Sequence, residues 1–172
     1  KYSPYANNII STCYKLLPMK TFGLGLSGGG VRALAHAGML KALDEHHLRP
    51  AVISGTSGGA LVGALYASGK TPEQLLDFFK QTPLFKFSML SLRKMGLINS
   101  NKYPALFEKN LSCTTFEELS IPLYVAATNL LSGKITYFSK GDLIAPMVAS
   151  SALPPYFSPI KIGEGVYCDG GL

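Results

Sequence analysis

A serine set among glycines carries the first sign of chemistry in this 172-residue chain. Ser57 lies in the segment Gly55-Thr56-Ser57-Gly58-Gly59, a G-x-S-x-G pattern that follows a short apolar run and precedes small residues typical of a helix. A nucleophilic serine needs its hydroxyl held out on a sharp turn between a strand and a helix, and flanking glycines permit that turn. The helix adds the positive end of its dipole. An ordinary glycine-rich loop is the alternative, but the strand–turn–helix context favours Ser57 as a nucleophile.

A second glycine-rich segment contains backbone groups suited to stabilising a negative charge. Gly28, Gly29 and Gly30 stand together after the apolar residues 22–26. Three consecutive glycines leave their N–H groups free to point at one spot, as an oxyanion hole requires. The N–H group of Gly58, directly after the serine, is a further candidate donor. We therefore predict that these four glycines form the oxyanion hole beside Ser57.

The same segment does not match the common nucleotide-binding loops. A Walker loop requires Lys followed by Ser or Thr after its last glycine, whereas Val31-Arg32 stands there. A dinucleotide fingerprint, G-x-G-x-x-G, matches by letter at Gly23, Gly25 and Gly28. Its first two glycines fall inside the predicted strand rather than after it, so we interpret the match as accidental.

Asp169 is the acidic residue best placed in the sequence to act as the base for Ser57. It follows a short predicted strand at 166–168 and precedes two glycines. The three histidines of the chain, His36, His46 and His47, all precede Ser57. An α/β-hydrolase triad runs Ser, then Asp or Glu, then His, so a triad here would need a histidine after the last residue of the chain. We expect His46 and His47 at the surface, and His36 in a packing or hydrogen-bonding role.

Predicted strands and helices alternate through the first half of the chain, an order typical of parallel β-α units. Thr71-Pro72 with Gln74 predicts a capping box and a proline at the first helical position. We predict one α/β domain with a mostly parallel central sheet flanked by helices in three layers. The predicted strands are at 22–26, 51–54, 123–128, 135–138 and 166–168, and the predicted helices are at 31–47, ending at 68, beginning after 71 and at 142–151.

In this order, the motifs resemble those of a known family. Gly28-Gly29-Gly30-Val31-Arg32, Gly55-Thr56-Ser57-Gly58-Gly59 and Asp169-Gly170-Gly171 look like the three signature elements of patatin-like phospholipases. The segment at 150–159, SSALPPYFSP, is similar to the family's Ser-Ala-x-Pro-x-x-Phe-x-Pro segment. One departure is Ala33, where many members carry Gly. We accordingly expect residues 1–18 to be an N-terminal extension and residues 19–172 to be a patatin-like acyl hydrolase domain that is cut short at its C-terminal end.

The resemblance implies a dyad of Ser57 and Asp169 with no catalytic histidine, a glycine-rich oxyanion loop and the hydrolysis of lipid acyl esters. It implies no metal or other cofactor, and the sequence contains no His/Cys/Asp cluster with the spacing of a metal site. Two other functions stay open. One is an ordinary α/β-hydrolase esterase with a histidine beyond residue 172, and the other is a lipid-binding module without catalytic activity.

The net charge of +6 favours anionic partners such as an acidic membrane surface. The basic residues are scattered and show no RNA-binding or zinc-finger pattern, so nucleic acid is not an expected partner. Arg32 either contacts the phosphate of a lipid head group or pairs with an acidic neighbour in the protein. The segment at 83–98 mixes bulky apolar residues with three basic ones. It either touches a membrane, borders a pocket for the acyl chain, or is a buried connection.

The spacing of the cysteines and the length of the apolar runs are typical of a cytoplasmic protein. The three cysteines lack CxxC spacing, which fits a reducing environment. Cys168, next to Asp169, is expected to be a small buried residue rather than a nucleophile. The apolar runs are all shorter than the roughly 20 residues that a transmembrane helix needs. We therefore expect a cytoplasmic protein, either free or in peripheral contact with a membrane.

Overall fold

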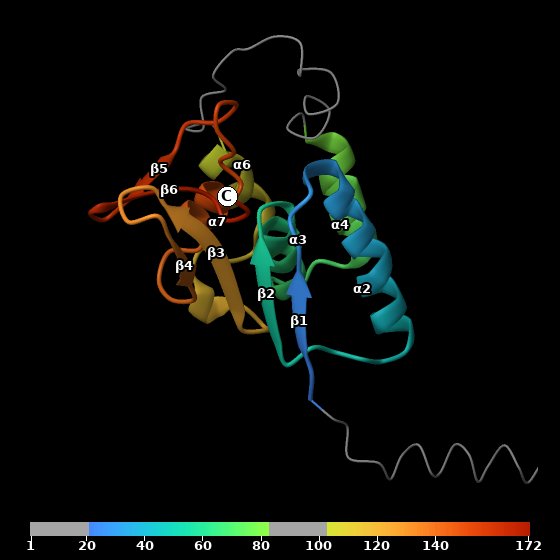
Figure 1. The fold of residues 1–172 in the computed structure, drawn as a ribbon. Coiled ribbons are helices and arrows are strands. Elements are labelled where there is room, and N and C mark those ends of the chain that lie inside the picture. Colours follow the sequence, from blue (N-terminus) through green and yellow to red (C-terminus); the bar gives the residue numbers. More distant parts are fainter. Residues whose placement is uncertain (1–20, 83–102) are drawn as a thin grey trace, which may run out of the picture.

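A six-stranded mixed sheet organises the residues that the computed structural model describes, 21–82 and 103–172 (Figure 1). Strands β1, β2 and β3 pair in parallel, whereas β4, β5 and β6 join the sheet by antiparallel pairing. The predicted α/β fold with a central sheet flanked by helices is confirmed. Its parallel part is limited to the first three strands, because turns at Gly133 and Gly163 reverse the chain. The strands are β1 (Gly23–Leu26), β2 (Val52–Thr56), β3 (Leu123–Asn129), β4 (Lys134–Phe138), β5 (Ile160–Ile162) and β6 (Gly165–Asp169).

Helices pack against this sheet and against one another. The described helices are η1 (Gly30–Leu34), α2 (Ala35–Glu45), α3 (Gly58–Ala67), α4 (Pro72–Gln81), α6 (Tyr103–Asn110), η4 (Phe116–Glu118) and α7 (Ile144–Ser150). Helix α3 contacts β1, β2 and β3, helix α7 contacts β3, β5 and β6, and α2 lies beside α4 (Figure 1). Every residue of α3 is buried, which explains why its sequence is small or apolar on all sides.

Local signals in the sequence explain where several elements begin. The Thr71 Oγ1 atom accepts a hydrogen bond from the Gln74 N–H, and Gln74 Oε1 accepts one from the Thr71 N–H, so the predicted capping box of α4 is confirmed. The helix predicted at 31–47 begins instead as the 3-10 helix η1 and continues as α2. Its first turn is tight because Gly29 and Gly30 have φ values of 148° and 56°, outside the helical region. The segment at 83–98 and the extension at 1–18 lie outside the described residues.

The pairing along β3 brings two distant parts of the chain together. Strand β2 pairs with β3 up to Thr56 opposite Ala126, and β6 pairs with it from Asp169 opposite Ala127. Strand β4 pairs with β3 across both of these stretches, so β2 and β6 share the opposite edge. Because β2 runs parallel and β6 antiparallel to β3, their C-terminal ends point toward each other. Ser57, the next residue after β2, therefore meets Asp169 at this junction.

Candidate active site

Ser57 occupies a strained turn between β2 and α3, as the sequence predicted. Its backbone has φ 53° and ψ −125°, a conformation that L residues rarely adopt. The carbonyl oxygen of Ser57 accepts the N–H groups of Ala60 and Leu61, which starts α3 immediately. The turn lies against the end of β1, since a Cβ on Gly59 would be 2.2 Å from the carbonyl oxygen of Leu26. A residue larger than glycine therefore cannot stand at position 59 without moving the strand.

Asp169 is hydrogen-bonded to Ser57. The Ser57 hydroxyl donates to Asp169 Oδ2 at 2.6 Å, across 112 positions of sequence, and the Asp169 residue is only 6% exposed. This distance is typical of a hydroxyl bonded to an ionised carboxylate. The other carboxylate oxygen, Oδ1, accepts the Gly171 N–H at 2.9 Å. Both oxygens thus have a donor, and the carboxylate is held with one of them facing the serine.

The glycine-rich loop lies directly beside the serine. A Cβ on Gly28 would be 3.1 Å from Ser57 Cβ, and a Cβ on Gly58 would be 3.1 Å from the carbonyl oxygen of Gly30. The loop is also tied to α2, because His36 Nε2 lies 2.9 Å from the carbonyl oxygen of Ser27. All three loop glycines are exposed. The fold thus brings together the four glycines that the sequence singled out, in contact with the turn that holds Ser57.

Ser150, the last residue of α7, and Ala152, two residues beyond it, contact the two members of the Ser57–Asp169 pair. The Ser57 N–H donates to Ser150 Oγ at 2.8 Å, and the Asp169 N–H donates to the carbonyl oxygen of Ala152 at 3.0 Å. Ser150 was not among the site residues predicted from the sequence. Its only signal was its position at the start of the SSALPPYFSP segment, which shows no chemical role by itself.

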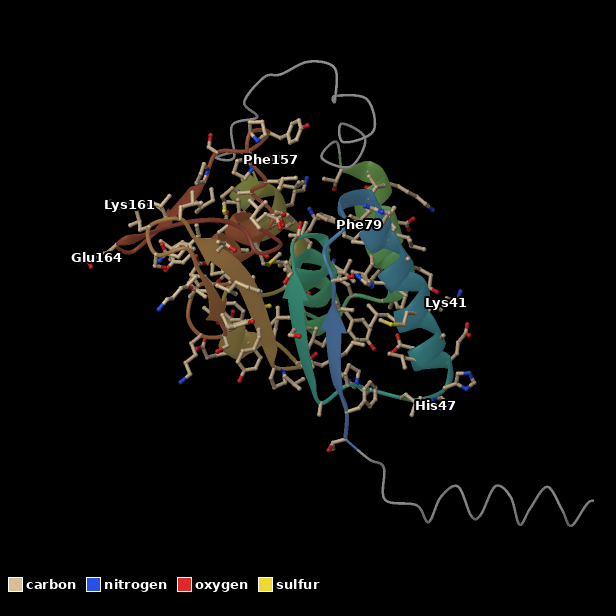
Figure 2. All side chains as sticks on the ribbon, viewed as in Figure 1. Lys41, His47, Phe79, Phe157, Lys161 and Glu164 are labelled. Atoms are coloured by element: carbon tan, nitrogen blue, oxygen red, sulfur yellow. The ribbon has the colours of Figure 1, made fainter. Side chains whose placement is uncertain are left out.

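No hydrogen bond joins the remaining candidates, His46, His47, Cys168 and Arg32, to the side chains of this pair among the described residues. His46 and His47 are exposed, and Figure 2 shows His47 at the end of the sheet opposite to the point where β2 leads into Ser57. Cys168 is fully buried, and burial together with the Asp169 carboxylate raises the pKa of its thiol, so its reactivity is low. Arg32 is exposed and forms no ion pair with another described residue.

Two further observations concern the described residues as a whole. Within 21–82 and 103–172, no group of three His, Cys, Asp or Glu side chains is arranged to hold a metal ion. No helix in these two ranges combines the length and the apolar character needed to cross a bilayer.

The model of the patatin-like phospholipase family matches residues 24–172, which include the serine turn, the glycine loop and Asp169. The chain belongs to the patatin-like phospholipase family. An uncharacterised NTE family protein of Mycobacterium bovis is 31% identical over 151 residues, covering 87% of this patatin-like chain and 42% of that protein. A lysophospholipase of Aspergillus fumigatus is 27% identical over 158 residues, covering 88% of this chain and 10% of that protein. The patatin-like chain thus spans less than half the length of these relatives.

Solved structures share the patatin-like fold at low sequence identity. VipD from Legionella pneumophila superposes with a TM-score of 0.59 at 16% identity, covering 90% of this chain and 46% of that one. The type III effector ExoU superposes with a TM-score of 0.52 at 17% identity, covering 80% of this chain and 41% of that one. At these identities the likeness concerns the fold alone.

Proposed function

We propose that this chain is a serine acyl hydrolase that cleaves the acyl ester bonds of lipids, with Ser57 as nucleophile and Asp169 as base. The observation that carries the proposal is the 2.6 Å hydrogen bond from Ser57 Oγ to Asp169 Oδ2. A serine hydroxyl is a weak nucleophile until an adjacent base takes its proton. Among the described residues, no histidine is hydrogen-bonded to either member of this pair, whereas the Asp169 carboxylate accepts a hydrogen bond from the Ser57 hydroxyl.

In the first step, Asp169 accepts the hydroxyl proton while Ser57 Oγ forms a bond to the ester carbonyl carbon. The electron pair of the carbonyl π bond moves to oxygen, and N–H groups of Gly28, Gly29, Gly30 and Gly58 stabilise that negative charge. When the tetrahedral intermediate collapses, the bond to the alcohol oxygen breaks. The alcohol leaves with the proton from Asp169, and the acyl group remains on Ser57.

In the second step, water releases the acyl group. Asp169 takes a proton from the attacking water, whose oxygen bonds to the acyl carbon, and the same oxyanion donors act again. Breaking the bond to Ser57 Oγ frees the carboxylic acid, and the proton returns to the serine. This cycle requires no metal ion, since the charge that develops is met by backbone donors.

Lipid esters are the substrate class that the comparisons support best. The family is one of phospholipases by its description, and a curated relative is named a lysophospholipase. Arg32 is exposed two residues after the glycine loop, where a guanidinium can meet the phosphate of a lipid head group. The net charge of +6 supports contact with an anionic membrane surface.

The decisive experiment is mass-spectrometric mapping of a fluorophosphonate adduct on the chain. Fluorophosphonates phosphonylate activated serines, so we expect a single adduct on the peptide that contains Ser57 and no adduct in Ser57→Ala. Hydrolysis of lysophosphatidylcholine should be lost in the same variant while its circular dichroism spectrum is unchanged. An adduct on Ser27 with Ser57 unlabelled would refute the assignment of the nucleophile, and lipid binding without turnover would favour a non-catalytic module.

A further inference from the structure

Ser150 joins the nucleophile turn to the sheet through one buried hydroxyl. Its Oγ accepts the Ser57 N–H at 2.8 Å and donates to the carbonyl oxygen of Ala126 at 2.6 Å. The residue is fully buried at the end of α7, so water does not replace it easily. A hydroxyl can donate one hydrogen bond while it accepts another. Here it accepts from the N–H group of Ser57 and donates to the carbonyl group of Ala126.

The two backbone groups that Ser150 bridges lie at a gap in the normal hydrogen-bonding pattern. Ser57 precedes the first residue of α3, so its N–H belongs to the groups that have no acceptor within the helix. Ala126 lies where β2 stops pairing with β3 and β6 begins. The Ser150 hydroxyl gives each of these two backbone groups a hydrogen-bond partner, and it thereby links α7, β3 and the turn of Ser57.

This link bears on the chemistry because Ser57 stands in a backbone conformation that its own residue type disfavours. Residues at φ 53° and ψ −125° persist only where surrounding contacts determine the conformation. The hydrogen bond to Ser150 is made by the backbone of Ser57, the same residue whose hydroxyl must face Asp169 Oδ2. The next turn of chain holds Asp169 itself, through the carbonyl oxygen of Ala152. The end of α7 and the two residues that follow it thus contact the backbones of both reacting residues.

We propose that Ser150 is a positioning residue, which holds the Ser57 backbone so that its hydroxyl points at Asp169 and at the ester carbonyl. The inference rests on the function proposed above and adds to it a residue that does not touch the substrate. Misplacing a reacting atom by about 1 Å costs on the order of 10²-fold in rate. Loss of the Ser150 hydroxyl should therefore lower kcat by about 10- to 100-fold, with KM changed by less than about threefold.

The test compares Ser150→Ala with Ser151→Ala in the full chain. Ser151 is the matched control, because it is the adjacent residue and its hydroxyl donates to the carbonyl oxygen of Met147 rather than bonding to Ser57. The measurements are kcat and KM on p-nitrophenyl butyrate, the rate of fluorophosphonate labelling, and amide exchange of the Ser57 N–H by NMR. We expect lower kcat, slower labelling and faster Ser57 exchange in Ser150→Ala, and values within about twofold of the parent in Ser151→Ala.

Several outcomes would overturn the inference. They are a folded Ser150→Ala protein with parental kcat and parental Ser57 exchange, an equal loss in Ser151→Ala, and a loss confined to KM. If Ser150→Ala does not fold, Ser150→Cys is the second variant, because it keeps a side chain of similar volume and weakens the hydrogen bonds. A reduced kcat in Ser150→Cys would support a positioning role, and a parental kcat would count against it. Hydrolysis that persists in Ser57→Ala would refute the proposed function. The amide exchange of the Ser57 N–H would test the hydrogen bond to Ser150 independently of that result.

Discussion

Replacing Asp169 by asparagine separates the base from every other role of this residue. The amide has the shape of the carboxylate, and its oxygen can still accept the Gly171 N–H that Oδ1 accepts at 2.9 Å. The amide nitrogen then takes the place of Oδ2, 2.6 Å from Ser57 Oγ, where it offers a donor instead of a proton acceptor. A general base contributes about 10²- to 10⁴-fold to rate. We therefore expect kcat to fall by about 10²- to 10⁴-fold, which corresponds to roughly 3–5 kcal/mol of transition-state stabilisation.

The assay is kcat and kcat/KM on p-nitrophenyl butyrate and on lysophosphatidylcholine, with thermal unfolding as the measure of folding. Ser57→Ala and the double variant complete the set. Residues that act as one unit lose function together, so the double variant should be little slower than either single variant. The combined replacement of His36, His46 and His47 by glutamine is the control, and its kcat should stay within about tenfold of the parent.

Two results would refute the reasoning. The first is a folded Asp169→Asn protein with parental kcat, which would mean that the 2.6 Å hydrogen bond has no part in proton transfer. The second is a collapse of activity in the histidine variant while Asp169→Asn stays active. That pattern would indicate a histidine base and therefore a triad in place of the dyad.

Three further predictions concern the oxyanion loop, a partly buried hydrogen bond and the surface charge. Gly29→Ala places a side chain on a residue with φ 148°, so kcat should fall by about 10²-fold. The control is Gly163→Ala in the turn between β5 and β6, where φ is 57°, and this variant should leave kcat unchanged. Similar kinetics in both variants would argue against the loop as an oxyanion hole. Burial and a hydrogen bond to Asp44 raise the pKa of Tyr66 from 10.0 to about 12, so this hydroxyl adds stability below pH 10 that is lost as the pH rises toward 12. Urea unfolding should show that Tyr66→Phe lowers the free energy of unfolding by about 1–3 kcal/mol at pH 8 and by less near pH 12, and an equal loss at both pH values would contradict this. Sedimentation with vesicles that contain phosphatidylglycerol should show binding that weakens as salt is added and weakens further in Arg32→Gln, and binding insensitive to both changes would exclude a role for charge.

Local sequence was sufficient for the parts of this protein that depend on neighbouring residues. The glycines around Ser57 predicted the turn between strand and helix, because close backbone approach needs residues without side chains. Thr71, Pro72 and Gln74 predicted the start of α4, since a capping box joins groups only three positions apart. The strands at 123–128 and 135–138 were likewise predicted, from two apolar runs on either side of Gly133. The sequence also named Ser57 and Asp169 as the candidate pair, although only from their motifs and order.

Tertiary structure alone decided how these parts meet. Strand β5 has three residues, too few for a periodic pattern, and it was not predicted. The contact between Ser57 and Asp169 depends on β2 and β6 sharing one edge of β3, a register that is determined by the packing of whole elements. The two hydrogen bonds of Ser150 are the clearest case, because its partners lie 93 and 24 positions away and no local pattern marks them. Contacts over such separations form only when the entire sheet and its helices are assembled, so they leave no signature in any short stretch of sequence.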